Sequence, residues 1–237
     1  MTSKNTDFSR RSFLKSMGVA GIGAVAGAHL ADAGAGAASA ESQQKVATRN
    51  FGQTGEKVSI LALGGNGGSL SRVMMNQAIK WGVTFWDAWD SDRFYGGGIS
   101  QKCIGKYFKK FPDDRKKTFL MTKTDDREPK TLAAFLDKAL EEMRTDTVDF
   151  FVIHSRRSVR SMTPEVRAWV AASKAAGKIR YFGISSHSRM ESVMHGAAEL
   201  GWVDGVMVTY NYRVMNNPSM IKAVESCQRA GLAIVAM

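Results

Sequence analysis

Short apolar runs recur along the chain at intervals of roughly 25–35 residues, the length of one strand followed by one helix. Most of these runs are nearly continuous, as expected for strands that are buried on both faces of a parallel sheet. Seven strands are predicted on this basis, at Ile60–Leu63, Val83–Trp86, Phe119–Thr122, Val148–Ile153, Arg180–Ile184, Val206–Thr209 and Ala233–Ala236.

Helical periodicity fills the segments between these runs. After Pro129, apolar residues from Leu132 to Met143 follow the spacing of one buried helical face. Thr163-Pro164 and Asn217-Pro218 each place a capping residue before a first-turn proline, and both helices are expected to end near a glycine. Alternating strands and helices leave two architectures, a (β/α) barrel and an open doubly wound sheet.

The glycine-rich run Gly64–Gly68 follows the first predicted strand, where a dinucleotide fingerprint would lie in a doubly wound sheet. Its spacing differs from Gly-x-Gly-x-x-Gly, and no acidic residue ends the second strand in the manner that binds a ribose. We therefore predict an α/β fold of the (β/α)8 barrel type, with about seven of the eight βα units present.

Four polar residues end the predicted strands or lie in the loops that follow them. Asp87, Lys123 and His154 come directly after apolar runs, and Tyr95 lies in the loop after the second run. In a parallel barrel the carboxyl ends of the strands converge on one mouth, where such folds place their active sites. An acid, a phenol, an amine and an imidazole at one mouth indicate a proton-transfer site.

The amino terminus has the pattern of an export signal. Ser9-Arg-Arg-Ser-Phe-Leu-Lys15 is a twin-arginine motif, a Gly- and Ala-rich stretch follows it, and Ala38-Ser-Ala40 offers a cleavage site. The alternative is a disordered tail that contains two arginines by chance. We expect a signal peptide at 1–40 that engages the twin-arginine export machinery, and a periplasmic or otherwise exported domain at 41–237 without a stable membrane span.

The charge of the chain is strongly basic. Removal of residues 1–40 takes away four basic and two acidic side chains, so the formal net charge falls from +11 to +9. Such a surface favours anionic small molecules, and no basic block with interleaved aromatics indicates nucleic acid. Arg156, Arg157 and Arg160 form one cluster of basic residues. We consider two interpretations: the cluster attracts an anionic substrate or a cofactor phosphate, or it belongs to a solvent-facing loop.

Cysteine use is sparse. Cys103 and Cys227 are far apart and form no Cys-x-x-Cys motif, so no metal or iron–sulfur site is predicted. An oxidising compartment permits a disulfide. Both residues fall on helical stretches, however, and we expect them to be small, buried apolar side chains.

From Asn50 to Met237 the sequence resembles the aldo-keto reductase family. The motifs occur in order. They are Phe51-Gly-Gln-Thr-Gly-Glu-Lys-Val-Ser59 for an opening hairpin at the bottom of the barrel, Leu61-Ala-Leu-Gly-Gly65, Gly82-Val-Thr-Phe-Trp-Asp-Ala88, Tyr95-Gly-Gly-Gly98, Thr122-Lys123, Val148-Asp149 through His154, and Gly177-Lys-Ile-Arg-Tyr-Phe-Gly-Ile-Ser185.

The resemblance implies reduction of a small aldehyde or ketone by NADP(H), which is bound in extended form across the barrel mouth. Tyr95 would be the general acid, and a nearby Lys123 ammonium would lower the pKa of the phenol from its usual ~10. Asp87 would hold Lys123 charged and oriented. His154 would donate a hydrogen bond to the substrate oxygen.

Several positions depart from the family pattern. Its aspartate usually precedes the tyrosine by five residues, which fits Asp90, but the strand motif ends at Asp87 and a three-residue insertion explains the difference. Ser185 and Ser186 stand in place of a Ser-Asn pair that binds the nicotinamide carboxamide. Met207 replaces a frequent glutamine, and Met237 lies where an aromatic residue commonly stacks on the nicotinamide.

The seventh predicted strand is also the last, so we expect the barrel domain to be incomplete at its C-terminus, as in a fragment of a longer protein. Three hypotheses follow. The chain is an exported reductase, a binding module that holds a nucleotide or small ligand without turnover, or an inactive fragment. Loss of carbonyl-dependent NADPH oxidation in Tyr95→Phe would distinguish the first from the second.

Overall fold

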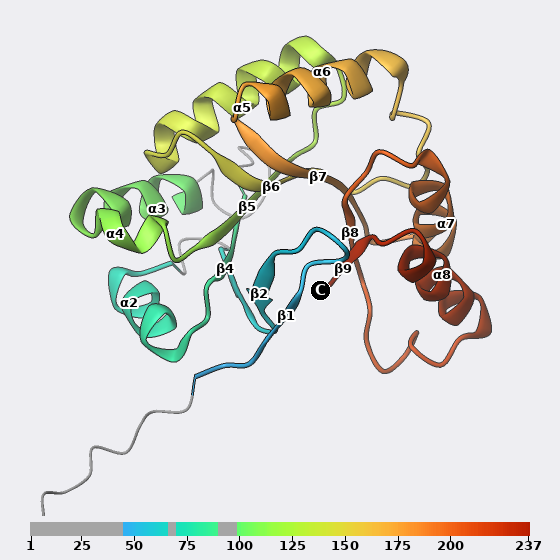
Figure 1. The fold of residues 1–237 in the computed structure, drawn as a ribbon, viewed down its shortest axis with the longest axis horizontal. Helices are drawn as coiled ribbons and strands as arrows, with labels where there is room; N and C mark the ends of the chain where they lie inside the picture. The colour runs from blue at the N-terminus through green and yellow to red at the C-terminus, as the bar shows by residue number, and fades with distance from the viewer. Residues whose placement is uncertain (1–44, 66–69, 90–98) are drawn as a thin grey trace, which may run out of the picture. The chain divides into compact units, whose positions relative to one another are not determined.

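A computed structural model describes residues 45–65, 70–89 and 99–237, which belong to one unit, Gln43–Met237. Seven parallel strands form one curled sheet in chain order, with helices along its outer side (Figure 1). The strands are β3 (Ala62–Gly64), β4 (Phe85–Trp89), β5 (Phe119–Thr124), β6 (Val148–Ile153), β7 (Ile179–Ser186), β8 (Gly205–Val208) and β9 (Ala233–Ala236). This is the arrangement of an incomplete (β/α)8 barrel, as predicted.

The first two predicted strands are displaced toward the C-terminus. Ile60 and Leu61 lie before β3 and are 54% and 58% exposed, so the apolar run there does not mark a buried strand. The predicted boundary at Trp86 is also wrong, because β4 continues to Trp89, which pairs with Lys123 of β5. Asp87 therefore lies inside its strand and not after it.

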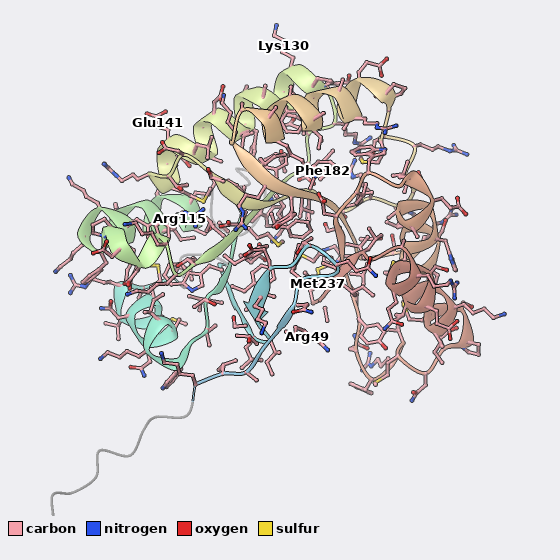
Figure 2. All side chains as sticks on the ribbon, viewed as in Figure 1. Arg49, Arg115, Lys130, Glu141, Phe182 and Met237 are labelled. Carbon is pink, nitrogen blue, oxygen red and sulfur yellow. The ribbon has the colours of Figure 1, made fainter. Side chains whose placement is uncertain are left out.

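The helices begin and end close to the sequence signals. They are α2 (Arg72–Trp81), α3 (Ile99–Lys110), α4 (Pro112–Arg115), α5 (Pro129–Met143), α6 (Pro164–Ala175), α7 (Met190–Leu200) and α8 (Pro218–Arg229). The Thr163 hydroxyl accepts from the amide of Val166, and the Asn217 side chain accepts from that of Ser219, which confirms both predicted caps. Lys130 and Glu141 of α5 point away from the sheet (Figure 2).

Side chains alternate along each strand between two separate cores. Phe85, Phe119 and Phe150 face the barrel interior. The intervening positions pack against the surrounding helices in a second, larger core, where the Phe182 ring of β7 stacks on Trp202 at 5.5 Å. This period of two follows from the pleat, and it decides which residues at the strand ends point inward.

The predicted hairpin closes one end of the barrel. Strands β1 (Thr48–Asn50) and β2 (Lys57–Ser59) pair antiparallel, and Figure 1 shows them lying across the arc of strands. Phe51, which follows β1, is 2% exposed and its ring centroid lies 4.8 Å from that of Phe119 and 4.9 Å from that of Phe150. The hairpin thus supplies the aromatic ring that fills the bottom of the interior.

A buried carboxylate joins three elements near the hairpin. Asp149 of β6 is 3% exposed and accepts hydrogen bonds from Arg115, Arg180 and the amide of Leu120 at 2.8–2.9 Å. Arg180 also pairs with Glu56 of the hairpin turn. Two cations and an amide compensate the desolvation of this single negative charge.

Both cysteines are free thiols; Cys227 is buried and Cys103 is partly exposed. Burial raises the pKa of Cys227 to about 11, so its thiol is protonated and packs as an apolar group. In residues 45–65, 70–89 and 99–237, no helix is both long and apolar enough to cross a membrane. The same stretches contain no cluster of three or more metal-binding side chains.

Candidate active site

The strand pleat places three predicted site residues inside the barrel. Asp87 lies two residues after the inward-facing Phe85, and Lys123 lies two residues after Met121 of the interior core. His154 has the same relation to Val152, which also belongs to this core. Since alternate residues share one face of a strand, all three side chains point into the barrel at its carboxyl end.

Asp87 and Lys123 form a buried ion pair. The Nζ atom of Lys123 donates to Oδ1 and Oδ2 of Asp87, each at 2.6 Å, and the side chains of Lys123 and Asp87 are 9% and 14% exposed. Burial raises the pKa of the Asp87 carboxyl, while the positive charge and hydrogen bonds of Lys123 act in the opposite direction. The predicted contact between these residues is present.

His154 lies beside this pair, against a tryptophan that follows Asp87 by two residues. The ring centroids of His154 and Trp89 are 4.6 Å apart, and Trp89 also lies 5.8 Å from the Lys123 ammonium. Nδ1 of His154 is 3.1 Å from Oδ1 of Asp125. Burial lowers the pKa of His154; Asp125 raises it, and Lys123 and His187 lower it further.

A close backbone approach forms one wall of the site. The amide of Gly65 donates to the carbonyl of Asp87 at 2.8 Å. A Cβ atom at residue 65 would lie 2.7 Å from that carbonyl oxygen and 2.8 Å from the side chain of Leu70. Only glycine therefore lets the chain after β3 pass this close to the strand that carries Asp87.

These residues surround a cavity of about 510 Å³. The Asp87–Lys123 pair and His154 form its polar part, and two methionine side chains form part of its apolar wall. Met237, one of the two, is labelled in Figure 2. The residues that line the cavity are Gly64, Gly65, Asp87, Trp89, Lys123, Asp125, His154, Ser155, His187, Met207 and Met237.

The three predicted cofactor-binding residues differ in position. Met207 lines the cavity. Ser185 and Ser186 are fully buried and have protein partners, since the Ser185 hydroxyl accepts from the amide of Ser155 and the Ser186 hydroxyl donates to the carbonyl of Ser188. Neither serine is among the residues that line the cavity.

Tyr95 and the alternative aspartate Asp90 lie outside the described residues. The segment that contains them connects Trp89 of β4 to Ile99 of α3. Its two ends are joined, because the Ser100 hydroxyl accepts from the amide of Trp89 at 2.9 Å and donates to its carbonyl at 2.6 Å. Trp89 and Ser100, which flank this segment, therefore lie side by side, and Trp89 lines the cavity.

Sequence reasoning missed Ser155 and three further residues of the cavity. Trp89, Asp125 and His187 all have the inward parity of their strands, two residues beyond Asp87, Lys123 and Ser185. Because every second side chain of a strand points to the same face, this alternation predicts that the three side chains point into the barrel. Extending each strand by one inward position would have found all three.

The fold and the cavity define a class of protein, a parallel barrel with a lysine–aspartate pair and a histidine at the carboxyl ends of its strands. A sequence profile described as "Aldo/keto reductase family" matches residues 63–237. This match spans most of the chain, and the chain belongs to that family.

Two curated relatives are similar over most of the chain. "Aldo-keto reductase yakc [NADP(+)]" of Schizosaccharomyces pombe is 28% identical over 178 residues, covering 70% of this chain and 50% of that protein. "L-galactose dehydrogenase" of Arabidopsis thaliana is 23% identical over 209 residues, covering 81% of this chain and 64% of that protein. The chain thus spans about half to two thirds of the length of these relatives.

Proposed function

We propose that the protein is an NAD(P)H-dependent oxidoreductase that reduces a small aldehyde or ketone to an alcohol, with Tyr95 as general acid. The observation that carries the proposal is the buried Asp87–Lys123 pair at a barrel mouth that also contains His154. Family membership supports it, as does the NADP(+) in the name of the fission-yeast relative.

The cavity suits the reacting end of a nicotinamide cofactor. Its volume of about 510 Å³ lies in the usual range for small-molecule sites, and Met207 and Met237 offer a polarisable wall for a flat ring. When bound, the cofactor supplies the hydride, for which no side chain is competent.

Ser185 and Ser186 are fully buried and do not line the cavity, so their predicted contact with the carboxamide requires a local rearrangement. Ser155 is the serine that lines the cavity. We therefore assign Met207 and Met237 to the ring contact and Ser155 to the polar contact.

The proton is supplied by the chain itself. Asp87 holds the Lys123 ammonium by hydrogen bonds to both carboxylate oxygens. A fixed positive charge stabilises a neighbouring phenolate, so Lys123 would lower the pKa of Tyr95 toward neutrality and improve it as an acid.

The test is NADPH oxidation that depends on added benzaldehyde, measured for the full chain and for Tyr95→Phe. We expect the variant to lose roughly 10²- to 10⁴-fold in kcat, the usual contribution of a general acid, with an unchanged melting temperature. The matched control is Tyr212→Phe, whose ring is 74% exposed. Ligand binding without turnover in the wild-type chain would instead identify a binding module.

We also propose that residues 1–40 direct export through the twin-arginine pathway, on the strength of the Ser9–Lys15 motif and the Ala38-Ser-Ala40 site. Amino-terminal sequencing of protein from the cell-envelope fraction should begin at Glu41. Replacement of both Arg10 and Arg11 by Lys should retain the uncleaved chain in the cytoplasm. Cleavage and export that persist in this variant would contradict the proposal.

A further inference from the structure

Arg156 is a buried cation beside the cavity, and the reaction proposed above does not use it. Its side chain is 8% exposed, and its Nε donates to the carbonyl of His154 at 2.6 Å. Among the residues that the structure describes, neither terminal nitrogen of Arg156 has a hydrogen-bond acceptor. One of them lies 3.9 Å from Oδ1 of Asp125, which is too far for a hydrogen bond. A charged group that is largely withdrawn from water thus has N–H groups without an acceptor.

The backbone holds Arg156 in this position. Ser155 has a φ of +53°, a left-handed conformation that is uncommon for residues other than glycine. Its amide donates to the Ser185 hydroxyl at 2.9 Å, and the amide of Arg156 donates to the Ser185 carbonyl at 2.7 Å. Strained turns that are fixed in this way are concentrated at ligand sites. The turn presents a guanidinium that is already ordered, so a ligand that binds it loses little further side-chain entropy.

The charges around Arg156 leave an excess of positive charge. Burial lowers the pKa of the guanidinium, the charge of Arg127 lowers it further, and the charge of Asp125 raises it. Two guanidinium groups thus share one carboxylate. That carboxylate is 53% exposed, and it also faces Nδ1 of His154 at 3.1 Å. An anionic group bound to the terminal nitrogens of Arg156 would supply the missing acceptor and reduce the repulsion between the two arginines.

Arg156 adjoins the cavity on the side of the proton-transfer residues. It contacts Asp125 and His154, which both line the cavity. Lys123 is on β5 and Arg156 follows β6, whereas the methionines assigned to the nicotinamide ring lie on β8 and after β9. β7 separates the two groups of strands. The guanidinium therefore lies toward the place expected for the reacting carbonyl and away from the proposed ring contact.

We propose that Arg156 is a specificity-determining residue that binds a carboxylate of the substrate, so that the enzyme favours aldehydes or ketones that carry an acidic group. This inference rests on the proposed function and leaves its chemistry unchanged, because the substrate carboxylate takes no part in hydride or proton transfer. The planar guanidinium offers two parallel N–H groups, which match the two oxygens of a carboxylate. The basic charge of the chain attracts anions in general, and Arg156 would select those with this geometry.

Proton and nitrogen-15 NMR of the full chain tests the contact without cofactor or turnover. The Nε–H signal of Arg156 is assigned by its loss in Arg156→Gln. Benzoate should shift this signal in a saturable way at constant ionic strength, and benzamide, which has a similar shape and no charge, should not. A lack of response to benzoate, or an equal response to both compounds, would overturn the proposal.

The matched pair of variants is Arg156→Gln and Arg157→Gln. Arg157 is the next residue and is exposed, so its replacement removes the same charge from a solvated position. The amide signal of Ser155 reports benzoate binding in both variants. We expect the affinity to fall about tenfold or more in Arg156→Gln, the value of a charge-assisted hydrogen bond, and less than about twofold in Arg157→Gln. Equal losses would reduce the effect to net charge and refute the assignment.

Asp125→Asn should act in the opposite direction. It removes the carboxylate that competes for the Arg156 guanidinium, so benzoate should bind about two- to tenfold more tightly. A purely structural role of Arg156, as a strut between Asp125 and the backbone of His154, predicts no such gain. Weaker binding in Asp125→Asn would contradict the proposal.

Kinetics test the substrate class. We expect 3- or 4-carboxybenzaldehyde to exceed its own methyl ester about tenfold or more in kcat/KM with NADPH, mainly through a lower KM. This ratio should fall to about one in Arg156→Gln and persist in Arg157→Gln. Equal rates for acids and esters in the wild type would refute the substrate class.

Two further outcomes separate this inference from its alternatives. If Arg156→Gln weakens NADPH binding as much as benzoate binding, the guanidinium contacts a cofactor phosphate and the proposal is wrong. If Arg156 binds benzoate and no aldehyde is turned over, the proposed function fails while the carboxylate site stands.

Discussion

The Nζ atom of Lys123 lies 2.6 Å from both carboxylate oxygens of Asp87, and both side chains are largely withdrawn from solvent. The two residues come from adjacent strands, and their inward direction is set by the same pleat that directs Phe85 and Met121 into the core. The pair therefore belongs both to the barrel interior and to the proposed active site.

Removal of one member of the pair should be worse than removal of both. Lys123→Met leaves the Asp87 carboxylate buried without its cation, which should cost about 3–5 kcal/mol of unfolding free energy. The double variant Asp87→Asn/Lys123→Met should recover a large part of this loss. Urea denaturation of the two single variants and the double variant measures the coupling; simple additivity would show that the ion pair contributes nothing.

Both single variants should also lose activity. Without the ammonium of Lys123, the phenol of Tyr95 keeps its ordinary pKa near ~10 and is a weak acid at neutral pH. We expect kcat for benzaldehyde to fall at least ~10²-fold in Lys123→Met. The residual rate should rise less steeply with falling pH than that of the wild type. A full rate in this variant would remove Lys123 from the mechanism.

The ring of Phe51 should be a major source of stability. It contacts the rings of Phe85, Phe119, Phe150 and Tyr181 with centroid distances of 4.8–6.2 Å. Phe51→Ala should cost about 3–5 kcal/mol, because a cavity would remain at the bottom of the barrel. Tyr212→Ala, at a ring that is 74% exposed, should change the free energy of unfolding by less than about 0.5 kcal/mol.

Loss of the buried Asp149 carboxylate should destabilise the protein more than loss of a carboxylate in a surface ion pair. Asp149→Ala leaves Arg115 and the amide of Leu120 without their buried acceptor, and we expect a loss of about 3–5 kcal/mol. Asp137 pairs with Lys178 at 2.6 Å, but the two side chains are 60% and 44% exposed. Asp137→Ala should therefore cost no more than about 1 kcal/mol. Urea denaturation measures the free energy of unfolding of both variants, and an equal decrease in Asp149→Ala and Asp137→Ala would contradict this ranking.

The stability of the protein should fall in mildly acidic solution in part through His154. Its pKa is lowered in the folded protein by burial, so the unfolded chain binds a proton more readily. The contribution of this group is complete above ~6.5, the ordinary value, and is lost as the pH falls toward and through the lowered pKa. His154→Gln should flatten this part of a plot of melting temperature against pH, and an unchanged slope would contradict the assignment.

Strand order and the Asp87–Lys123 contact were predictable from the sequence. Continuous apolar runs are typical of strands buried on both faces, and polar residues at the carboxyl ends of such strands meet at the mouth of a parallel barrel. The start of β3 was not predictable. Ile60 and Leu61 look like strand residues, but the Ser59 hydroxyl donates to the carbonyl of Leu61 and accepts from the amides of Thr84 and Phe85. This side-chain bonding holds the segment out of the sheet.

The two serines that were predicted to bind the cofactor show a second limit of sequence reasoning. The sequence places Ser185 and Ser186 at the end of β7, but it does not reveal the partners of their hydroxyls. Asp125 shows the converse, since its contact with His154 joins the ends of two different strands. Hydrogen bonds between distant segments are a property of the fold, and composition and periodicity carry little trace of them.

The hairpin that carries Phe51 has a consequence for the order of folding. The amide of Gln53 donates to the carbonyl of Gly231 at 2.9 Å, which joins the first and the last elements of the described chain. A contact between such distant residues closes a very long loop and gains its enthalpy only after the intervening chain is ordered. During synthesis this bond therefore forms only after Gly231 has left the ribosome, later than the four rings of β4 to β7 that contact Phe51.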